Sequence, residues 1–114
     1  DPGDGDYASI VEAAASRIGS TYRLAASGPD AFDCSGLVSW SYAQFGITLP
    51  RSSSAMRAVG TVIPASEARP GDIAWSPGHV SIYLGGDQQI EAVGPGQGVQ
   101  QTRMWQSSVT FLRF

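Results

Sequence analysis

Hydrophobic residues in the first half of the chain recur at helical spacing. Residues 7–19 predict a first helix, which Gly19 can end, and residues 34–45 predict a second helix that ends before Gly46. The serines at 52–54 can cap a short third helix that reaches about residue 58. The apolar positions behind the first two helices are Ile10, Val11, Ala14 and Ile18, and then Cys34, Leu37, Val38, Tyr42 and Phe45.

The second half of the chain shows a different pattern. After the turn sequence RPGD at residues 69–72, apolar and polar residues alternate, which is typical of strands. We place strands near 72–76, 79–85, 88–93, 99–103 and 109–114, separated by turns rich in glycine and proline. Helices followed by about five antiparallel strands predict an α+β domain.

The composition fits one compact domain over residues 7–114. The chain has 114 residues, of which 42% are hydrophobic and 15% charged, and we interpret residues 1–6, DPGDGD, as the end of a linker from a longer parent protein. Its net charge is −3 and it has no basic run, so we expect no nucleic-acid partner. No apolar run approaches the roughly 20 residues that cross a bilayer, so we expect no membrane span. Trp40 and Trp75 are expected in the core, and Trp105 either there or lining a groove.

The single cysteine, Cys34, lies where a loop is expected to become the second helix. A lone thiol cannot form an internal disulfide, so Cys34 is either a buried apolar residue or a chemically active one. A helix start favours the active thiolate, because unpaired backbone N–H groups and the helix dipole lower the thiol pKa. The same N–H groups can donate to an oxyanion. Position alone leaves both interpretations open.

The single histidine, His79, begins the expected hairpin of residues 79–93. A lone histidine is more often structural, but a cysteine nucleophile needs a base and no other imidazole is present. With residues 85–87 as the loop, one face of the hairpin is almost wholly apolar and Glu91 lies diagonal to His79 on the other face. Glu91 can then orient the imidazole, although a solvent-facing glutamate is the alternative. The predicted opposed pairs are Leu84 with Gln88, Ile82 with Ile90, and Val80 with Ala92.

Several segments of the chain form a specific combination. They are FDCSGLV at residues 32–38, GHVSIYLG at 78–85 and IEA at 90–92, supported by GITLPRSS at 46–53 and RPGD at 69–72. Together they resemble the NlpC family of papain-like bacterial cell-wall peptidases. The resemblance covers nearly the whole chain from Tyr7 onward. It implies a papain-like core with N-terminal helices packed on an antiparallel sheet. It also implies hydrolysis of peptidoglycan stem peptides, commonly at the γ-D-glutamyl bond to a diamino acid.

The resemblance implies three catalytic residues. Cys34 corresponds to the nucleophile, His79 to the base, and Glu91 to a third polar residue that is often His, Asn or Gln in other members. Four further positions correspond to groove residues. They are Tyr22, a tyrosine that helps to stabilise the intermediate, and Asp33, Ser35 and Arg51, which form the substrate groove or its support.

One departure from the family sequence leaves the substrate preference open, and two other functions remain as alternatives. Many members follow the tyrosine with Trp-Gly-Gly, whereas residues 22–26 here are YRLAA, which puts the pocket upstream of the scissile bond in doubt. The fold could instead serve as a catalytically silent wall-binding module, or as an amidase or acyltransferase on another amide. We expect a secreted or cell-wall-associated monomer whose export signal lies outside this chain. No cofactor is expected, nor a metal, because the Cys, His and acidic residues lack zinc-ligand spacing.

Overall fold

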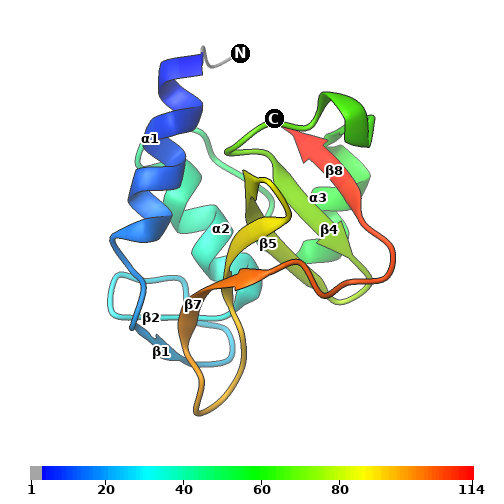
Figure 1. Cartoon of the computed structure of the whole chain (residues 1–114). Helices are drawn as coiled ribbons and strands as arrows, with labels where there is room; N and C mark the ends of the chain where they lie inside the picture. The colour runs from blue at the N-terminus through cyan, green and yellow to red at the C-terminus, as the bar shows by residue number, and fades with distance from the viewer. Residues whose placement is uncertain (1–3) are drawn as a thin grey trace.

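The structure is a computed structural model that describes residues 4–114, and Figure 1 shows its helices beside a twisted sheet. The helices are α1 (Asp4–Ala15), α2 (Cys34–Ala43), α3 (Ser53–Val59) and a short 3-10 helix, η1 (Ala65–Glu67). A small parallel pair consists of β1 (Thr21–Tyr22) and β2 (Ala31–Phe32). The large sheet contains β3 (Thr61–Ile63), β4 (Ile73–Ser76), β5 (His79–Gly85), β6 (Gln88–Ala92), β7 (Val99–Arg103) and β8 (Thr110–Arg113).

The large sheet is antiparallel throughout and has the strand order β3-β8-β4-β5-β6-β7. The predicted α+β class is therefore confirmed, and the described residues form six strands in this sheet rather than about five. The additional strand, β3, has only three residues and pairs with β8, far along the chain. So short a segment has no room for a clear alternation of apolar and polar residues, which is why its sequence did not mark it as a strand.

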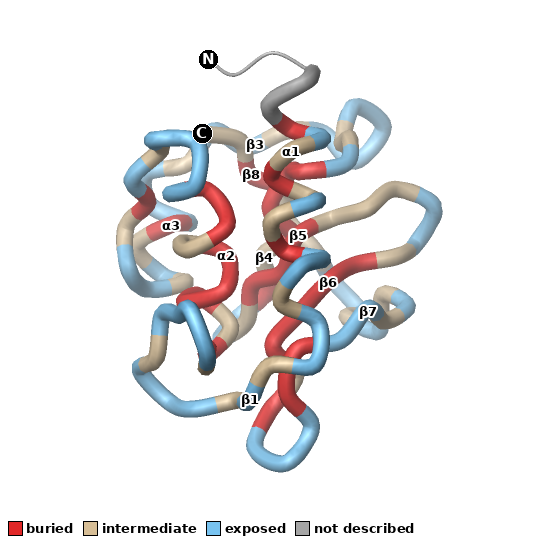
Figure 2. Tube along the Cα trace, turned by 90° about the vertical axis from the view of Figure 1, so that its left-hand side faces the viewer, coloured by how far each residue is buried: buried red, intermediate tan, exposed pale blue. Residues whose placement is uncertain are grey.

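The helices cover one face of the large sheet, and the core lies between them. Helix α2 packs on β5 and β6, and α1 packs on α2. Strand pairing puts the buried Ile73, Ile82 and Ile90 side by side, and Leu112 of β8 also pairs with Ile73. Figure 2 shows the resulting continuous buried zone through α2 and the central strands. Burial of this apolar layer is the main favourable contribution to folding.

The predicted helices are present, but three of their boundaries were wrong. Helix α1 begins at Asp4 and ends at Ala15, so residues 4–6 of the expected linker are helical and residues 1–3 lie outside the described part. Because turns replace the last helical turn before Gly19, Ile18 is exposed. Helix α2 begins at Cys34 as predicted and ends at Ala43, which leaves Phe45 exposed. Helix α3 is capped by Ser52, whose hydroxyl accepts from the N–H of Ala55.

The hairpin of β5 and β6 has the predicted register at Ile82 and departs from it beside its turn. Ile82 pairs with Ile90 as predicted, but Gly85, not Leu84, pairs with Gln88. The turn uses two residues with positive φ, Gly86 at 57° and Asp87 at 68°, the conformation that joins antiparallel strands most tightly. The residue left over is absorbed by a register shift between Tyr83 and Gly85.

A buried ion pair ties the last strand to the turn before β4. The fully buried carboxylate of Asp72 accepts from Nε and Nη2 of Arg113 at 2.9 and 2.7 Å, and from the N–H of Arg69 at 3.0 Å. All of its bonds are to donors, so an ionised carboxylate fits this position.

We expect Asp72→Asn to lower the free energy of unfolding by about 3 kcal/mol, because the guanidinium of Arg113 would then face a neutral amide in a mostly buried setting. Urea denaturation measures the change. The exposed pair of Asp87 and Arg103 supplies the matched control, since Asp87→Asn should cost no more than about 0.5 kcal/mol. Equal losses in the two variants would contradict this account of Asp72.

Candidate active site

The start of α2 is fixed by Asp33, which places Cys34 in the first helical turn. The Asp33 side chain is the N-cap: Oδ1 accepts from the N–H of Gly36 at 2.7 Å, and Oδ2 accepts from the N–H of Ala25 at 2.9 Å. Gly36 is required here because an added Cβ would lie 2.0 Å from the carbonyl oxygen of Ala26. The DCSG sequence thus brings the preceding loop against the helix and leaves Cys34 at its N-terminus.

Arg51 joins this helix start to the loop before α3. Its Nη2 contacts both carboxylate oxygens of Asp33, at 3.1 and 3.2 Å, and its Nη1 donates to the hydroxyl of Ser35 at 2.6 Å. These three residues line a hollow of about 410 Å³ beside the helix start. The structure therefore brings together the three residues that the sequence suggested for the groove or its support.

Cys34, His79 and Glu91 meet where α2, β5 and β6 come together. Cys34 is only partly buried, and the His79 ring and the backbone N–H of Val80 lie close enough to lower the pKa of its thiol. Nε2 of His79 lies 2.7 Å from Oε1 of Glu91. Since Nε2 faces the carboxylate, Nδ1 is the ring nitrogen left for the sulfur. Glu91 is not solvent-facing: its side chain is 1% exposed.

The three groups shift one another's pKa values toward a charged pair. Burial, the largest single effect on His79, lowers its pKa, but hydrogen bonds and charge from Cys34 and Glu91 outweigh it and raise the pKa to about 9. Burial disfavours the charged form of Cys34 as well, and so raises the pKa of its thiol. The interactions with the His79 ring and the Val80 N–H, together with the imidazolium charge, outweigh burial and lower this pKa overall. A thiolate beside an imidazolium is the state these shifts favour.

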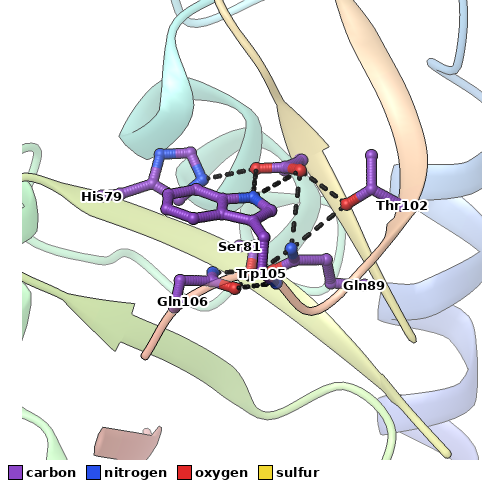
Figure 3. A network of polar contacts seen from close by, with 7 residues as sticks. His79, Ser81, Gln89, Thr102, Trp105 and Gln106 are labelled. Carbon is purple, nitrogen blue, oxygen red and sulfur yellow. Dashed lines mark hydrogen bonds and ion pairs between the residues drawn. The ribbon is translucent and has the colours of Figure 1, made fainter. Parts of the chain in front are cut away.

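Glu91 is held by a network that the sequence did not reveal. Its carboxylate accepts from Thr102 Oγ1 at 2.5 Å and from the Trp105 indole N–H at 3.0 and 3.2 Å. Gln89 adds a longer contact of 3.4 Å, and Figure 3 shows these side chains gathered beside His79. Burial opposes ionisation of Glu91, but the donors and the imidazolium lower its pKa. The predicted alternation put Gln89 and Glu91 on one face; no local signal marked Thr102 or Trp105.

Tyr22 of β1 lies close enough to respond to the charge at Cys34. Burial raises the pKa of Tyr22, and the negative charges of Cys34 and Asp33 raise it further, so its hydroxyl stays protonated and can donate. The residue also lines a second hollow of about 220 Å³ together with residues 19–21 and 96–98. The structure thus puts Tyr22 in the surroundings of the thiol, as the sequence suggested.

Two features of the described residues 4–114 bear on ligands and membranes. They contain no group of three or more His, Cys, Asp or Glu side chains arranged to hold a metal ion. No helix in the same range is both long and apolar enough to cross a bilayer.

Known proteins are similar to this chain in sequence and in fold. The family model described as the NlpC/P60 family matches residues 19–112. The chain belongs to the NlpC/P60 family. A probable endopeptidase of Corynebacterium glutamicum is 49% identical over 87 residues, which cover 74% of this chain and 42% of that protein. The chain spans less than half the length of the curated relatives it matches first.

Solved NlpC/P60 structures include both hydrolytic and non-catalytic proteins. The peptidoglycan hydrolase RipB of Mycobacterium tuberculosis superposes with a TM-score of 0.85 at 29% identity, over 96% of this chain and 64% of that one. RipD of the same organism, described as a non-catalytic NlpC/p60 domain protein adapted to peptidoglycan binding, gives 0.83 at 28% identity, over 95% and 96%. Family membership alone therefore does not separate hydrolysis from binding.

Proposed function

We propose that this domain is a cysteine endopeptidase that hydrolyses peptidoglycan stem peptides. The observation that carries the proposal is the partly exposed Cys34 beside His79, whose Nε2 lies 2.7 Å from Oε1 of Glu91. A nucleophile, a base and a residue that orients the base are the parts of a thiol hydrolase. A module that only bound the wall would need none of them in this geometry, so the arrangement favours hydrolysis over silent binding.

The scissile bond we propose is the γ-D-glutamyl bond to a diamino acid, following the family resemblance. The hollow at the start of α2 supports a substrate of this polar kind, because Asp33, Ser35 and Arg51 offer both charges and a hydroxyl there. Residues 22–26 differ from the usual Trp-Gly-Gly continuation, so the preferred peptide fragment is expected to differ from that of members with the usual sequence.

The proposed reaction has two steps. The Cys34 thiolate attacks the γ-glutamyl carbonyl carbon, and the oxyanion accepts hydrogen bonds from the Cys34 N–H and the Tyr22 hydroxyl. The His79 imidazolium then protonates the departing amine, which leaves a thioester on Cys34. In the second step neutral His79 takes a proton from water, the hydroxide adds to the thioester carbonyl, and collapse releases the acid and restores the thiolate.

Digestion of purified peptidoglycan tests the proposal. We expect mass spectrometry to find new fragments with a free diamino-acid amine and a free γ-carboxyl group on glutamate. Binding to the wall without any new fragment would overturn the endopeptidase proposal in favour of a binding module. Cleavage at another amide, or transfer of the acyl group to an added amine in place of water, would instead identify an amidase or acyltransferase.

Glu91→Ala should reduce hydrolysis less than loss of the base does. We expect kcat/KM to fall about 10²-fold, because the residue that orients a base contributes less than the base itself. In Glu91→Gln the fall in kcat/KM should be smaller still, since an amide oxygen can still accept from His79 at this position. Rates of fragment release at saturating and limiting peptide measure both variants. A loss in Glu91→Ala equal to that in His79→Ala would contradict this ranking.

We also propose where the domain acts and in what oligomeric state. A peptidoglycan substrate lies outside the cytoplasm, so we propose a secreted or cell-wall-associated protein that acts as a monomer. Sedimentation of the purified domain at micromolar concentration tests the monomer, and a dimer would overturn it.

A further inference from the structure

Trp105 combines two properties that rarely occur together. Trp105 lies in the segment between β7 and β8, and 61% of the residue is exposed to solvent. Its indole N–H nevertheless donates to both oxygens of the buried Glu91 carboxylate, at 3.0 and 3.2 Å. Figure 3 shows the indole beside the His79 ring, and the ring centroids are 5.4 Å apart with an interplanar angle of 46°. Trp105 thus contacts both members of the His79–Glu91 pair from the solvent side.

The backbone of Trp105 is itself fastened to the sheet. Its N–H donates to Oε1 of Gln106 at 3.0 Å, and the side-chain amides of Gln106 and Gln89 exchange two hydrogen bonds of 2.9 and 3.3 Å. Gln89 is fully buried in β6 and also accepts from the hydroxyl of Ser81 at 2.5 Å. An exposed segment is therefore attached to a buried amide, which fixes where the indole N–H points.

We propose that Trp105 is a positioning residue that acts through Glu91. Its N–H holds the carboxylate in the rotamer that binds Nε2 of His79, and its ring covers the ion pair from water. A charge-assisted hydrogen bond is directional, and exclusion of water strengthens it. The catalytic part of this inference rests on the proposed hydrolysis; the part that concerns the geometry of His79 and Glu91 does not.

The main competing explanation is that the exposed indole only contacts substrate. An aromatic residue beside a cleft can supply apolar surface to a ligand, and the loss of such a contact raises KM without lowering kcat. A residue that orients the base acts on kcat instead. The two explanations therefore predict opposite kinetic results.

Trp105→Phe is the decisive variant, because it removes the indole N–H and keeps an aromatic ring. We expect kcat to fall about tenfold with little change in KM, since Glu91 loses one donor and keeps Thr102 and Gln89. Trp105→Ala removes the ring as well and should lower kcat further. Trp40→Phe is the matched control, because Trp40 packs edge-on against Phe32 and makes no contact with Glu91. It should keep the kcat and KM of the unsubstituted domain.

The single histidine makes a second, kinetics-free measurement possible. In a ¹⁵N-labelled sample every imidazole N–H signal belongs to His79, and the Nε2 proton that it donates to Glu91 should give a downfield signal that is followed separately from that of Nδ1. We expect this signal to move upfield or to broaden by exchange with water in Trp105→Phe and Trp105→Ala, and to stay unchanged in Trp40→Phe.

The outcomes separate this inference from the proposed function. An unchanged His79 signal in both Trp105 variants overturns the positioning role, as does a rise in KM at constant kcat. If the unsubstituted domain releases no fragments, the proposed hydrolysis fails, and the His79 signal alone decides whether Trp105 positions Glu91.

Discussion

Cys34→Ala should abolish hydrolysis of peptidoglycan while the domain stays folded. Cys34 carries the only thiol in the chain, and its sulfur is the nucleophile that lies beside His79, so a loss on the order of 10⁶-fold in kcat is expected. The fold should tolerate the change, because Asp33 caps α2 and alanine is the best helix former. Fragment release measured by mass spectrometry gives the activity, and thermal unfolding gives the stability.

Ser39→Ala is the matched control for Cys34→Ala. Ser39 is in the same helix, and its buried hydroxyl has no hydrogen-bond partner among residues 4–114, so its removal should cost no stability. The control should keep full activity. Hydrolysis that survives in Cys34→Ala would exclude the thiol mechanism, and hydrolysis lost in both variants would point to a general effect on α2.

His79→Ala should be nearly as damaging and should also change the acidity of the thiol. A loss on the order of 10⁴-fold in kcat/KM is expected when a general acid-base group is removed. In the unsubstituted domain the thiolate–imidazolium pair exists between the lowered pKa of Cys34 and the pKa of about 9 of His79. Without the imidazole, burial is left as the dominant influence, so the pKa of the Cys34 thiol should rise.

Alkylation by iodoacetamide across a pH series measures that rise directly. The unsubstituted domain should react rapidly at pH values well below the ordinary thiol pKa of 9.0, because part of its thiol is already ionised there. His79→Ala should react only as the pH approaches or exceeds that value. Superposable pH profiles for the two proteins would show that no ion pair exists between sulfur and imidazole.

Local sequence patterns predicted the parts of the site that lie close together along the chain. Apolar pairing of Ile82 with Ile90 set the hairpin register, and that register put Glu91 near His79, where the structure has it. The apolar residues at helical spacing in 34–45 predicted a helix that begins at Cys34, as the structure has it. The catalytic roles of these residues are a proposal. The proximity of His79 and Glu91 followed from the hairpin spacing, whereas the position of Cys34 beside them was implied by the family resemblance.

The rest of the site depends on pairings that no local pattern encodes. Thr102 reaches Glu91 only because β7 pairs with β6 in one particular register, with Gln89 opposite Thr102. Trp105 comes after a strand, in an irregular segment with no hydrophobic period, so the sequence could only suggest a core or groove position. The bulge after Tyr83 was missed for a related reason: pairing rules count opposed residues and do not foresee one that is left over.

The position of β8 in the sheet constrains the order in which the domain can be completed. This strand, the last along the described chain, lies between β3 and β4, which precede it by dozens of residues. During synthesis on the ribosome, the backbone N–H and C=O groups of β3 and of one edge of β4 stay unpaired until residues 110–113 have emerged. Exposed strand edges favour association with other chains. The nascent domain is therefore more prone to aggregation before β8 has paired than after it.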